Sequence, residues 1–259
     1  MTIGKVVPRR GRVDLYWLPL GAGERSGCVR WNGRVFEALA ARRDHRVPCD
    51  LYHSALEVHL DDGRFTVEMT PVWGNGDGDR GVVSTGPVGL RRLGRSRFFR
   101  YEVRRWRDGT IPDLTEAVGG PRCVTDRVDL AHRVLDLVPA VPTATWGRDE
   151  LRTGDMWNSN SLTSFLLARS GVLTEDLTPP VGGRAPGWSA GLVVAARRAG
   201  GDIDPSTPVR AKPSNAGADT SADLTHFVNS PRRSTDPSRV KSGSCWASLL
   251  DVRWSRWSR

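Results

Sequence analysis

The sequence predicts an α+β domain in which an antiparallel sheet packs against helices. Strand-like alternation of apolar residues clusters before residue 110, whereas helix-like periodicity appears after residue 125. From Gly200 onward, Ser, Thr, Pro, Asp and Arg dominate, so this part buries too little apolar surface to offset its ordering entropy. We therefore expect a folded domain over residues 12–198 and a low-complexity, disordered tail over residues 199–259.

The composition limits the classes of protein to be considered. The chain has 259 residues, of which 38% are hydrophobic and 26% charged, and a net charge of +9 that comes almost entirely from arginine. This charge is compatible with nucleic acid or another polyanion as a partner, which is not the favoured interpretation, because an arginine bias is also typical of GC-rich genomes. The longest apolar stretch is too short for a membrane span, and the first residues lack the apolar region of a signal peptide. We expect no transmembrane segment, free cysteines and a cytoplasmic location.

Four segments are predicted as strands. Residues 13–20 form the first, and residues 98–106 form the last. Between them, residues 52–60 and 64–70 alternate apolar and polar side chains on either side of a two-residue turn at Asp62-Gly63. This turn predicts a register in which six apolar residues share one face: Leu60 opposite Phe65, Val58 opposite Val67, and Leu56 opposite Met69.

Four segments are predicted as helices, covering residues 32–43, 126–138, 159–170 and 189–198. Asn32 is a suitable N-cap for the first, and Gly171 is a suitable C-cap for the third. The apolar side of the first helix is predicted to contain Val35, Phe36, Leu39 and Ala40.

His53 begins the second predicted strand and is the first candidate for chemistry. A histidine on the polar face of a strand can act as a general base near neutral pH. The small side chains of Ser54 and Ala55 leave room for a second group to approach. The alternative interpretation is a surface histidine on a solvated sheet face.

A run of four polar residues, Asn158 to Ser161, stands immediately before a strongly apolar helix. A nucleophile at a helix N-terminus gains from the macrodipole and from free N–H groups that can hold an oxyanion. The alternative is plain N-capping, since Asn and Ser are preferred caps, but one residue would satisfy it. Ser159 and Ser161 are therefore the candidate nucleophiles.

The two stretches together resemble the circularly permuted branch of the NlpC-type papain-like superfamily, which includes lecithin:retinol-acyltransferase-like proteins. In that branch a histidine-bearing strand and a hairpin precede an Asn-Cys-Asn-Ser-Phe-like stretch that opens a helix. Here His53-Ser54-Ala55-Leu56, the Asp62-Gly63 turn and Asn158-Ser159-Asn160-Ser161-Leu162 follow in the same order within residues 50–170. The resemblance implies a permuted papain-like fold. It also implies a hydrolase or acyltransferase acting on amide or ester bonds, with a small-molecule, peptide or lipid substrate and no cofactor.

The sequence departs from this family at the nucleophile, where Ser159 stands in place of cysteine. A serine hydroxyl needs a well-aligned base to be nucleophilic, whereas a thiolate is accessible near neutral pH. Ser159 is interpreted either as a serine variant of the same chemistry, with His53 as base, or as the mark of a silent fold that uses its cleft for binding.

Glu68 is the candidate third member of the site, because a papain-like histidine is oriented by a polar residue on the following strand. It lies on the same predicted sheet face as His53. The predicted register nevertheless places Glu68 opposite Glu57 and diagonal to His59, so a solvated polar face is the alternative interpretation.

Two further patterns in the sequence bear on metal and nucleic-acid binding. The spacing of His45, Cys49 and His53 suits a metal-binding helix, but Pro48 disfavours that helix and no fourth ligand is evident, so we predict no metal. Residues 91–107 contain eight arginines interleaved with aromatic residues. Such a segment either binds nucleic acid through phosphates and stacking, or forms an edge strand with an arginine-rich outer face, which is the favoured interpretation.

Overall fold

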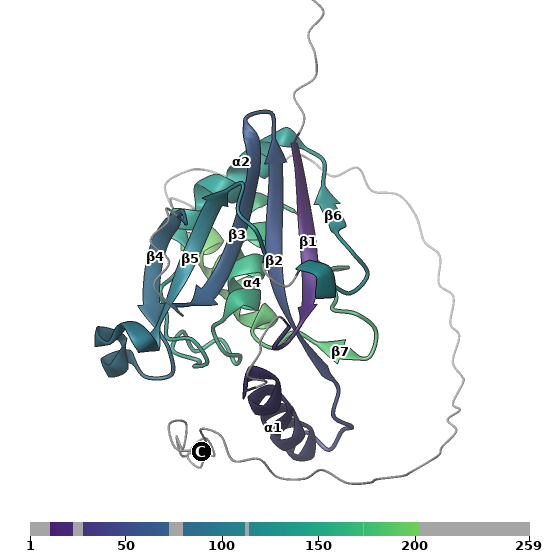
Figure 1. The fold of residues 1–259 in the computed structure, drawn as a ribbon, viewed down its shortest axis with the longest axis vertical. Coiled ribbons are helices and arrows are strands. Elements are labelled where there is room, and N and C mark those ends of the chain that lie inside the picture. Colours follow the sequence, from purple (N-terminus) through teal and green to yellow (C-terminus); the bar gives the residue numbers. More distant parts are fainter. Residues whose placement is uncertain (1–10, 23–27, 73–79, 112–113, 173, 202–259) are drawn as a thin grey trace, which may run out of the picture. The chain divides into compact units, whose positions relative to one another are not determined.

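An antiparallel sheet lies at the centre of the fold (Figure 1). A computed structural model of the chain describes residues 11–22, 28–72, 80–111, 114–172 and 174–201. Its strands are β1 (Gly11–Pro19), β2 (Asp50–Leu60), β3 (Gly63–Pro71), β4 (Val82–Pro87), β5 (Arg100–Arg107), β6 (Arg122–Thr125) and β7 (Gly183–Arg184). They follow the order β4-β5-β3-β2-β1-β6, and the short β7 pairs in parallel with the start of β2.

The helices are α1 (Cys28–Arg43), α2 (Val128–Leu137), α3 (Ser159–Ser170) and α4 (Trp188–Gly201). Four short 3₁₀ turns accompany them: η1 (Arg91–Arg95), η2 (Arg97–Phe99), η3 (Leu114–Glu116) and η4 (Val138–Ala140). Helices α2, α3 and α4 pack on one face of the sheet, whereas α1 lies beyond one end of the strands (Figure 1). The predicted α+β class is confirmed. No helix within the described ranges is long and apolar enough to cross a membrane.

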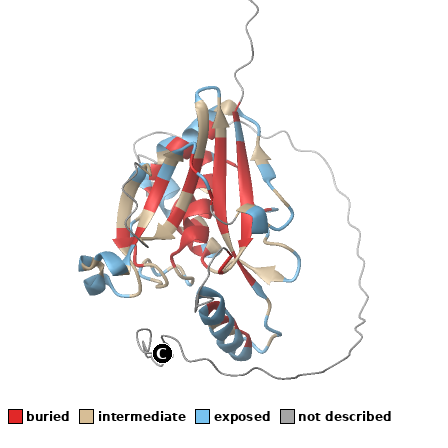
Figure 2. Cartoon of the chain, in the orientation of Figure 1, coloured by how far each residue is buried: buried red, intermediate tan, exposed pale blue. Residues whose placement is uncertain are grey.

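Helix α3 is the centre of the core. Nearly all its side chains are buried, and Figure 2 shows it as part of the buried layer behind the central strands. It packs on the sheet face that carries Val13, Leu15 and Trp17 of β1 and Leu56 and Val58 of β2. Because side chains alternate along a strand, the residues between these point to the opposite face. That second face holds a smaller apolar cluster of Tyr16, Leu18, Ala55 and Ile111.

The predicted hairpin exists, but its predicted register is wrong by two residues. Leu60 pairs with Gly63 and Val58 with Phe65, so the turn is formed by Asp61 and Asp62. A shift of two leaves every side chain on the same face, and for this reason the apolar pattern does not distinguish the two registers.

The predicted apolar side of the first helix is also wrong in part. Helix α1 begins at Cys28, four residues before the expected Asn32 cap, and Val35 and Leu39 are exposed. The buried side contains Ala41 and the carboxylate of Glu37 instead.

The arginine-rich segment does not form the expected edge strand. Phe98 and Phe99 lie in η2, and β5 begins at Arg100 between β3 and β4 in the interior of the sheet. At the other end of the chain, α4 continues to Gly201, three residues past the predicted domain boundary. The rest of the predicted tail, residues 202–259, lies outside the described residues.

Candidate functional site

The polar run before α3 forms a capping box. The side-chain oxygen of Asn158 accepts hydrogen bonds from the backbone N–H groups of Asn160 at 2.9 Å and Ser161 at 3.4 Å. In return, the hydroxyl of Ser161 accepts from the backbone N–H of Asn158 at 3.1 Å. These bonds satisfy N–H groups that a helix start otherwise leaves open. Fewer free donors therefore remain here for an oxyanion.

Asn160 ties α3 to the sheet. Its side-chain nitrogen donates to the backbone oxygens of Tyr52 at 2.9 Å and Pro186 at 2.8 Å, and its side-chain oxygen accepts from the Ser54 hydroxyl at 2.8 Å. All five atoms belong to buried or partly buried residues, where unpaired polar atoms are costly. Ser54, noted in the sequence only for its small size, is therefore the β2 residue that meets the polar run.

The segment from Pro186 to Trp188 wraps the start of α3. The Ser161 hydroxyl donates to the backbone oxygen of Gly187 at 2.7 Å, and the Ser164 hydroxyl donates to that of Trp188 at 2.7 Å. Gly187 has a φ of 90°, and a Cβ there would lie 2.2 Å from the Asn158 side-chain oxygen. Only glycine fits at this point.

Asp155 completes this polar network and was not singled out from the sequence. Its carboxylate accepts from the backbone N–H groups of Met156 and Gly187, each at 2.8 Å. Burial raises the pKa of Asp155, although these hydrogen bonds oppose the shift. In the sequence, only its position shortly before the polar run indicates a role for Asp155. This position does not distinguish it from an ordinary aspartate in a loop.

The structure does not bring His53 to the serines. His53 pairs with Leu18 of β1, which belongs to the apolar cluster on the second face, whereas its neighbour Ser54 bonds to Asn160 on the α3 face. His53 and the start of α3 therefore lie on opposite faces of the sheet. Burial lowers the pKa of His53 to about 4, and its ring has no hydrogen-bond partner among the described residues.

The two candidate nucleophiles differ in their surroundings. Ser161 uses its hydroxyl in the capping box and in the bond to Gly187. Ser159 is the first residue of α3 and is buried, and within the described part of the chain its hydroxyl has no hydrogen-bond partner. Neither serine has an imidazole within hydrogen-bond reach on its own face of the sheet among the residues described.

Glu68 shares the second face with His53 but has another partner. It lies opposite Arg104 of β5, which donates to its carboxylate at 3.1 Å and also pairs with Glu102 at 2.7 Å. Glu57 lies opposite Thr66, not Glu68, so the predicted pair of facing carboxylates is absent from this sheet.

The charged groups of the second face form ion pairs. Glu57 accepts from the Tyr16 hydroxyl and from Arg64, both at 2.9 Å. His59 lies between Asp14 and Glu57, at 3.4 and 3.7 Å from their carboxylate oxygens. Burial, followed by the hydrogen bond to Glu57, raises the pKa of Tyr16. Because the carboxylates of Asp14 and Glu57 are buried and paired, this part of the face is better described as an ion-paired network than as a fully solvated surface, although His59 and Arg64 are partly exposed.

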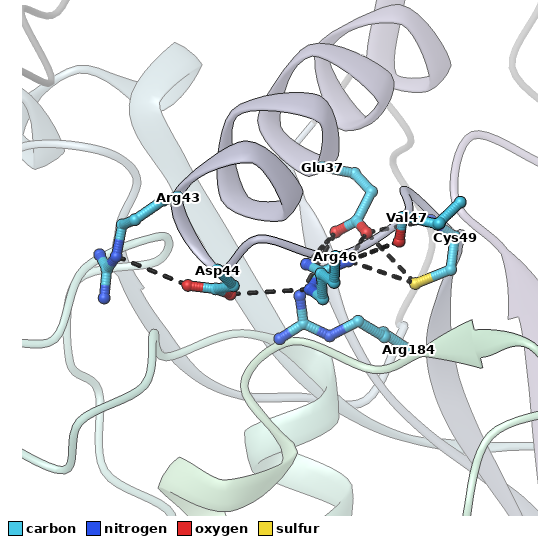
Figure 3. Close-up of polar contacts among 7 residues, drawn as sticks. All are labelled: Glu37, Arg43, Asp44, Arg46, Val47, Cys49 and Arg184. Atoms are coloured by element: carbon cyan, nitrogen blue, oxygen red, sulfur yellow. Dashed lines mark hydrogen bonds and ion pairs between the residues drawn. The ribbon is translucent and has the colours of Figure 1, made fainter.

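Helix α1 is held to the domain by a second charged cluster (Figure 3). Glu37 accepts hydrogen bonds from Arg46 and from the backbone N–H of Cys49, and its carboxylate lies 3.4 Å from the guanidinium of Arg184 in β7. Burial would raise the pKa of Glu37, but the hydrogen bonds from Arg46 and Cys49 outweigh it and lower the pKa to about 2. Cys49 is a free cysteine, and burial raises the pKa of its thiol, so it lacks the character of a reactive nucleophile.

Exposed arginines gather on α1 and η1. Arg34 and Arg42 of α1, together with Arg92 and Arg95 of η1, are exposed and have no ion-pair partner in the described ranges. Arg104, by contrast, is buried and paired, which removes it from any surface that a nucleic acid contacts.

No group of three or more His, Cys, Asp or Glu residues suited to a metal ion occurs among the described residues. A scan against protein-family models and searches of curated proteins and of solved structures gave no match to this chain. The arrangement of its own side chains is therefore the basis for the functional assignment.

Proposed function

We propose that the domain is a non-catalytic binding module that recognises a polyanionic partner. The observation that carries this proposal is the placement of Arg34, Arg42, Arg92 and Arg95 at one end of the sheet, exposed and unpaired within the described residues. Unpaired surface charges of one sign raise the local concentration of an oppositely charged partner. Paired arginines such as Arg104 do so far less, because a carboxylate already neutralises them.

The strand register supports the grouping of these arginines. Pro19 pairs with Tyr52, and the chain between them contains α1. Pro87 pairs with Arg100, and the chain between them contains η1 and η2. In the antiparallel sheet both connections leave from the same end, the end at which β2 starts and β3 finishes. We call this end of the domain, with α1, η1 and η2, the basic end.

The surroundings of α3 support the non-catalytic part of the proposal. Asn158, Asn160 and Ser161 use their side chains to hold backbone groups of β2 and of the Pro186–Trp188 segment. Serine chemistry needs a base hydrogen-bonded to the hydroxyl and a group that orients the base. Ser159 and His53 lie on opposite sheet faces. Among the described residues, the Ser159 hydroxyl has no base bonded to it and the His53 ring has no group that orients it. Membership of the permuted papain-like superfamily stays a prediction from the motif order.

The polyanion proposal is tested by binding to a fluorescent heparin fragment at several salt concentrations. We expect binding that weakens as salt is added and that falls at least tenfold in Arg34→Glu/Arg42→Glu and in Arg92→Glu/Arg95→Glu. Arg122→Glu/Arg133→Glu is the matched control, because it changes the net charge equally at exposed positions away from the basic end. Equal losses in all three double variants, or binding that does not depend on salt, would contradict the proposal.

The non-catalytic assignment has its own test. We expect no labelling of the chain by a fluorophosphonate probe, with or without Ser159→Ala. A cysteine at this position, introduced as Ser159→Cys, gains some acidity from the helix start alone, so His53 must be varied as well. We expect the thiol pKa of Ser159→Cys to be the same when His53→Gln is added. A rise of about one pKa unit on removal of His53 would show a thiolate–imidazole pair and restore the hydrolase hypothesis.

A further inference from the structure

Apolar side chains are exposed beside the arginines of the basic end. On α1, Trp31 and Leu39 are each 61% exposed, and Val35 lies between them at 38%. The three positions are four residues apart, so they form one stripe along the helix. Burying this stripe would remove a large apolar area from water, but no described segment covers it.

The connection between β4 and β5 repeats this combination. Phe98 is 73% exposed, and Leu90 and Leu93 are also exposed. They alternate with Arg92 and Arg95, as Trp31, Val35 and Leu39 alternate with Arg34 and Arg42. Two segments that are more than forty residues apart therefore present the same mixture of aliphatic, aromatic and arginine side chains.

A third segment at the same end exposes an apolar residue. Val181 is fully exposed in the turn before β7, and β7 pairs with Asp50 and Leu51 at the start of β2. Figure 1 shows α1, the η1–η2 connection and β7 all at the lower ends of the strands. Scattered single apolar residues are normal on a surface, but a set at one end of a sheet indicates an interaction site.

The stripe on α1 is fixed in its outward direction. The opposite side of the helix carries Glu37, whose buried carboxylate is bonded to Arg46 and to Cys49 and faces Arg184 (Figure 3). Rotating α1 to bury Trp31 and Leu39 would expose that carboxylate and separate it from its partners. The helix is thus held with its apolar stripe in water.

We propose that the basic end docks on an anionic lipid bilayer, with Trp31, Val35 and Leu39 inserted among the headgroups and the arginines bound to lipid phosphates. An amphipathic helix with arginine beside a Trp/Leu stripe lies in the plane of such an interface. Basic residues near an anionic leaflet add an electrostatic attraction. This inference rests on the proposed function, because it identifies the polyanionic partner as an anionic lipid bilayer.

The aliphatic residues favour a bilayer over a nucleic acid. A single-stranded nucleic acid stacks its bases on aromatic rings, and Trp31 and Phe98 would serve that purpose. Leu39, Leu93 and Val181 have no ring on which a base can stack. A bilayer takes up aliphatic and aromatic side chains alike, and it contacts three separate segments at once because it is a continuous surface.

Flotation of the full chain with vesicles tests the inference. We expect the chain to float with phosphatidylcholine vesicles that contain 30% phosphatidylglycerol and to stay unbound with phosphatidylcholine alone. Trp31→Ser/Leu39→Ser is expected to lower the partition coefficient at least tenfold. Val82→Thr is the matched control, since it removes an exposed apolar group from β4 without effect on the basic end. Thermal unfolding of the variants checks the fold, which exposed substitutions should leave intact.

The outcomes separate the two proposals. Flotation that is unaffected by Trp31→Ser/Leu39→Ser would overturn the docking of α1. Salt-dependent binding of heparin or a mixed-sequence oligonucleotide without flotation would overturn the bilayer inference and leave the polyanion proposal in place. Absence of binding to vesicles, heparin and oligonucleotide would overturn both.

Discussion

The hydroxyl of Ser54 donates a hydrogen bond to the side-chain oxygen of Asn160 at 2.8 Å, and this bond joins strand β2 to the start of helix α3. The two residues are 106 positions apart in the chain. A hydroxyl and an amide thus meet between β2 and the start of α3. The hypothesis of serine chemistry requires that their chain neighbours, His53 and Ser159, meet there instead. The pair stabilises the domain, and its contribution is measurable.

Replacing Asn160 by Ala is expected to lower the free energy of unfolding by about 3 kcal/mol, because it leaves the Ser54 hydroxyl and the backbone oxygen of Tyr52 without a partner. The backbone oxygen of Pro186 keeps its bond from the Asn158 side chain. Ser54→Ala removes one bond and should cost about 1 kcal/mol. Urea unfolding of both variants and of the double variant gives the coupling between them, which we expect to be about 1 kcal/mol. Additive losses would show that the bond contributes nothing.

Gly191 is expected to tolerate no side chain. A Cβ on this residue of α4 would lie 2.1 Å from the Ser164 hydroxyl and 2.2 Å from the backbone oxygen of Ser161. Gly191→Ala must therefore push α4 away from α3, at a cost of about 2 to 3 kcal/mol in unfolding free energy. Gly200→Ala in the same helix meets no atom within 4 Å, and should leave stability unchanged or raise it by up to about 1 kcal/mol. Chemical denaturation distinguishes the two, and equal effects would refute the close packing.

His53 is expected to make stability depend on pH. Its pKa falls to about 4 in the folded chain from its ordinary value of 6.5, so between these values the unfolded chain binds a proton that the folded chain does not. Stability is therefore complete above pH 6.5 and falls as the pH drops toward 4, with a total loss on the order of 3 kcal/mol.

The measurement is the urea midpoint at intervals from pH 7 to pH 4. His53→Gln should remove most of the fall, while His132→Gln, at an exposed position of α2, should retain it. A wild-type midpoint that stays constant over this range would contradict the burial of a neutral imidazole.

Local sequence signals predicted the four helices and four of the strands in the described part of the chain, but they missed β4, β6 and β7 and the partners that the elements find in the fold. The bounds of α3 and its Gly171 C-cap are confirmed, because a helix terminus is decided within a few residues. Capping by Asn158, the alternative to a nucleophile site, is what the structure shows. Glu37 is different. Its buried carboxylate is held by Arg46 and Cys49, which follow the helix, and by Arg184, which is 147 positions away, and the apolar pattern of α1 contains no sign of these partners. Arg104 was likewise expected on an outer face, since its carboxylate partner lies on another strand.

The position of His53 was implicit in the sequence. Leu56 and Val58 define the apolar face of β2, and an odd spacing places His53 on the other face. Helix α3 is strongly apolar and packs on the apolar face. The order of the motifs suggested that Ser159 and His53 meet, whereas strand periodicity separates them. Strand periodicity is the firmer argument, because it follows from backbone geometry, whereas the order of the motifs is only a resemblance to a protein family.

The segment between β1 and β2 makes α1 an insertion into the sheet domain. The strands are neighbours and Pro19 pairs with Tyr52, so the segment that contains α1 is a long insertion in what is otherwise a hairpin. The entropy of closing a loop grows slowly with its length, by only about 0.6 kcal/mol for each doubling. The insertion of α1 therefore costs the sheet little folding free energy. We expect that α1 can be exchanged, shortened or replaced by a turn while the remaining strands keep their order.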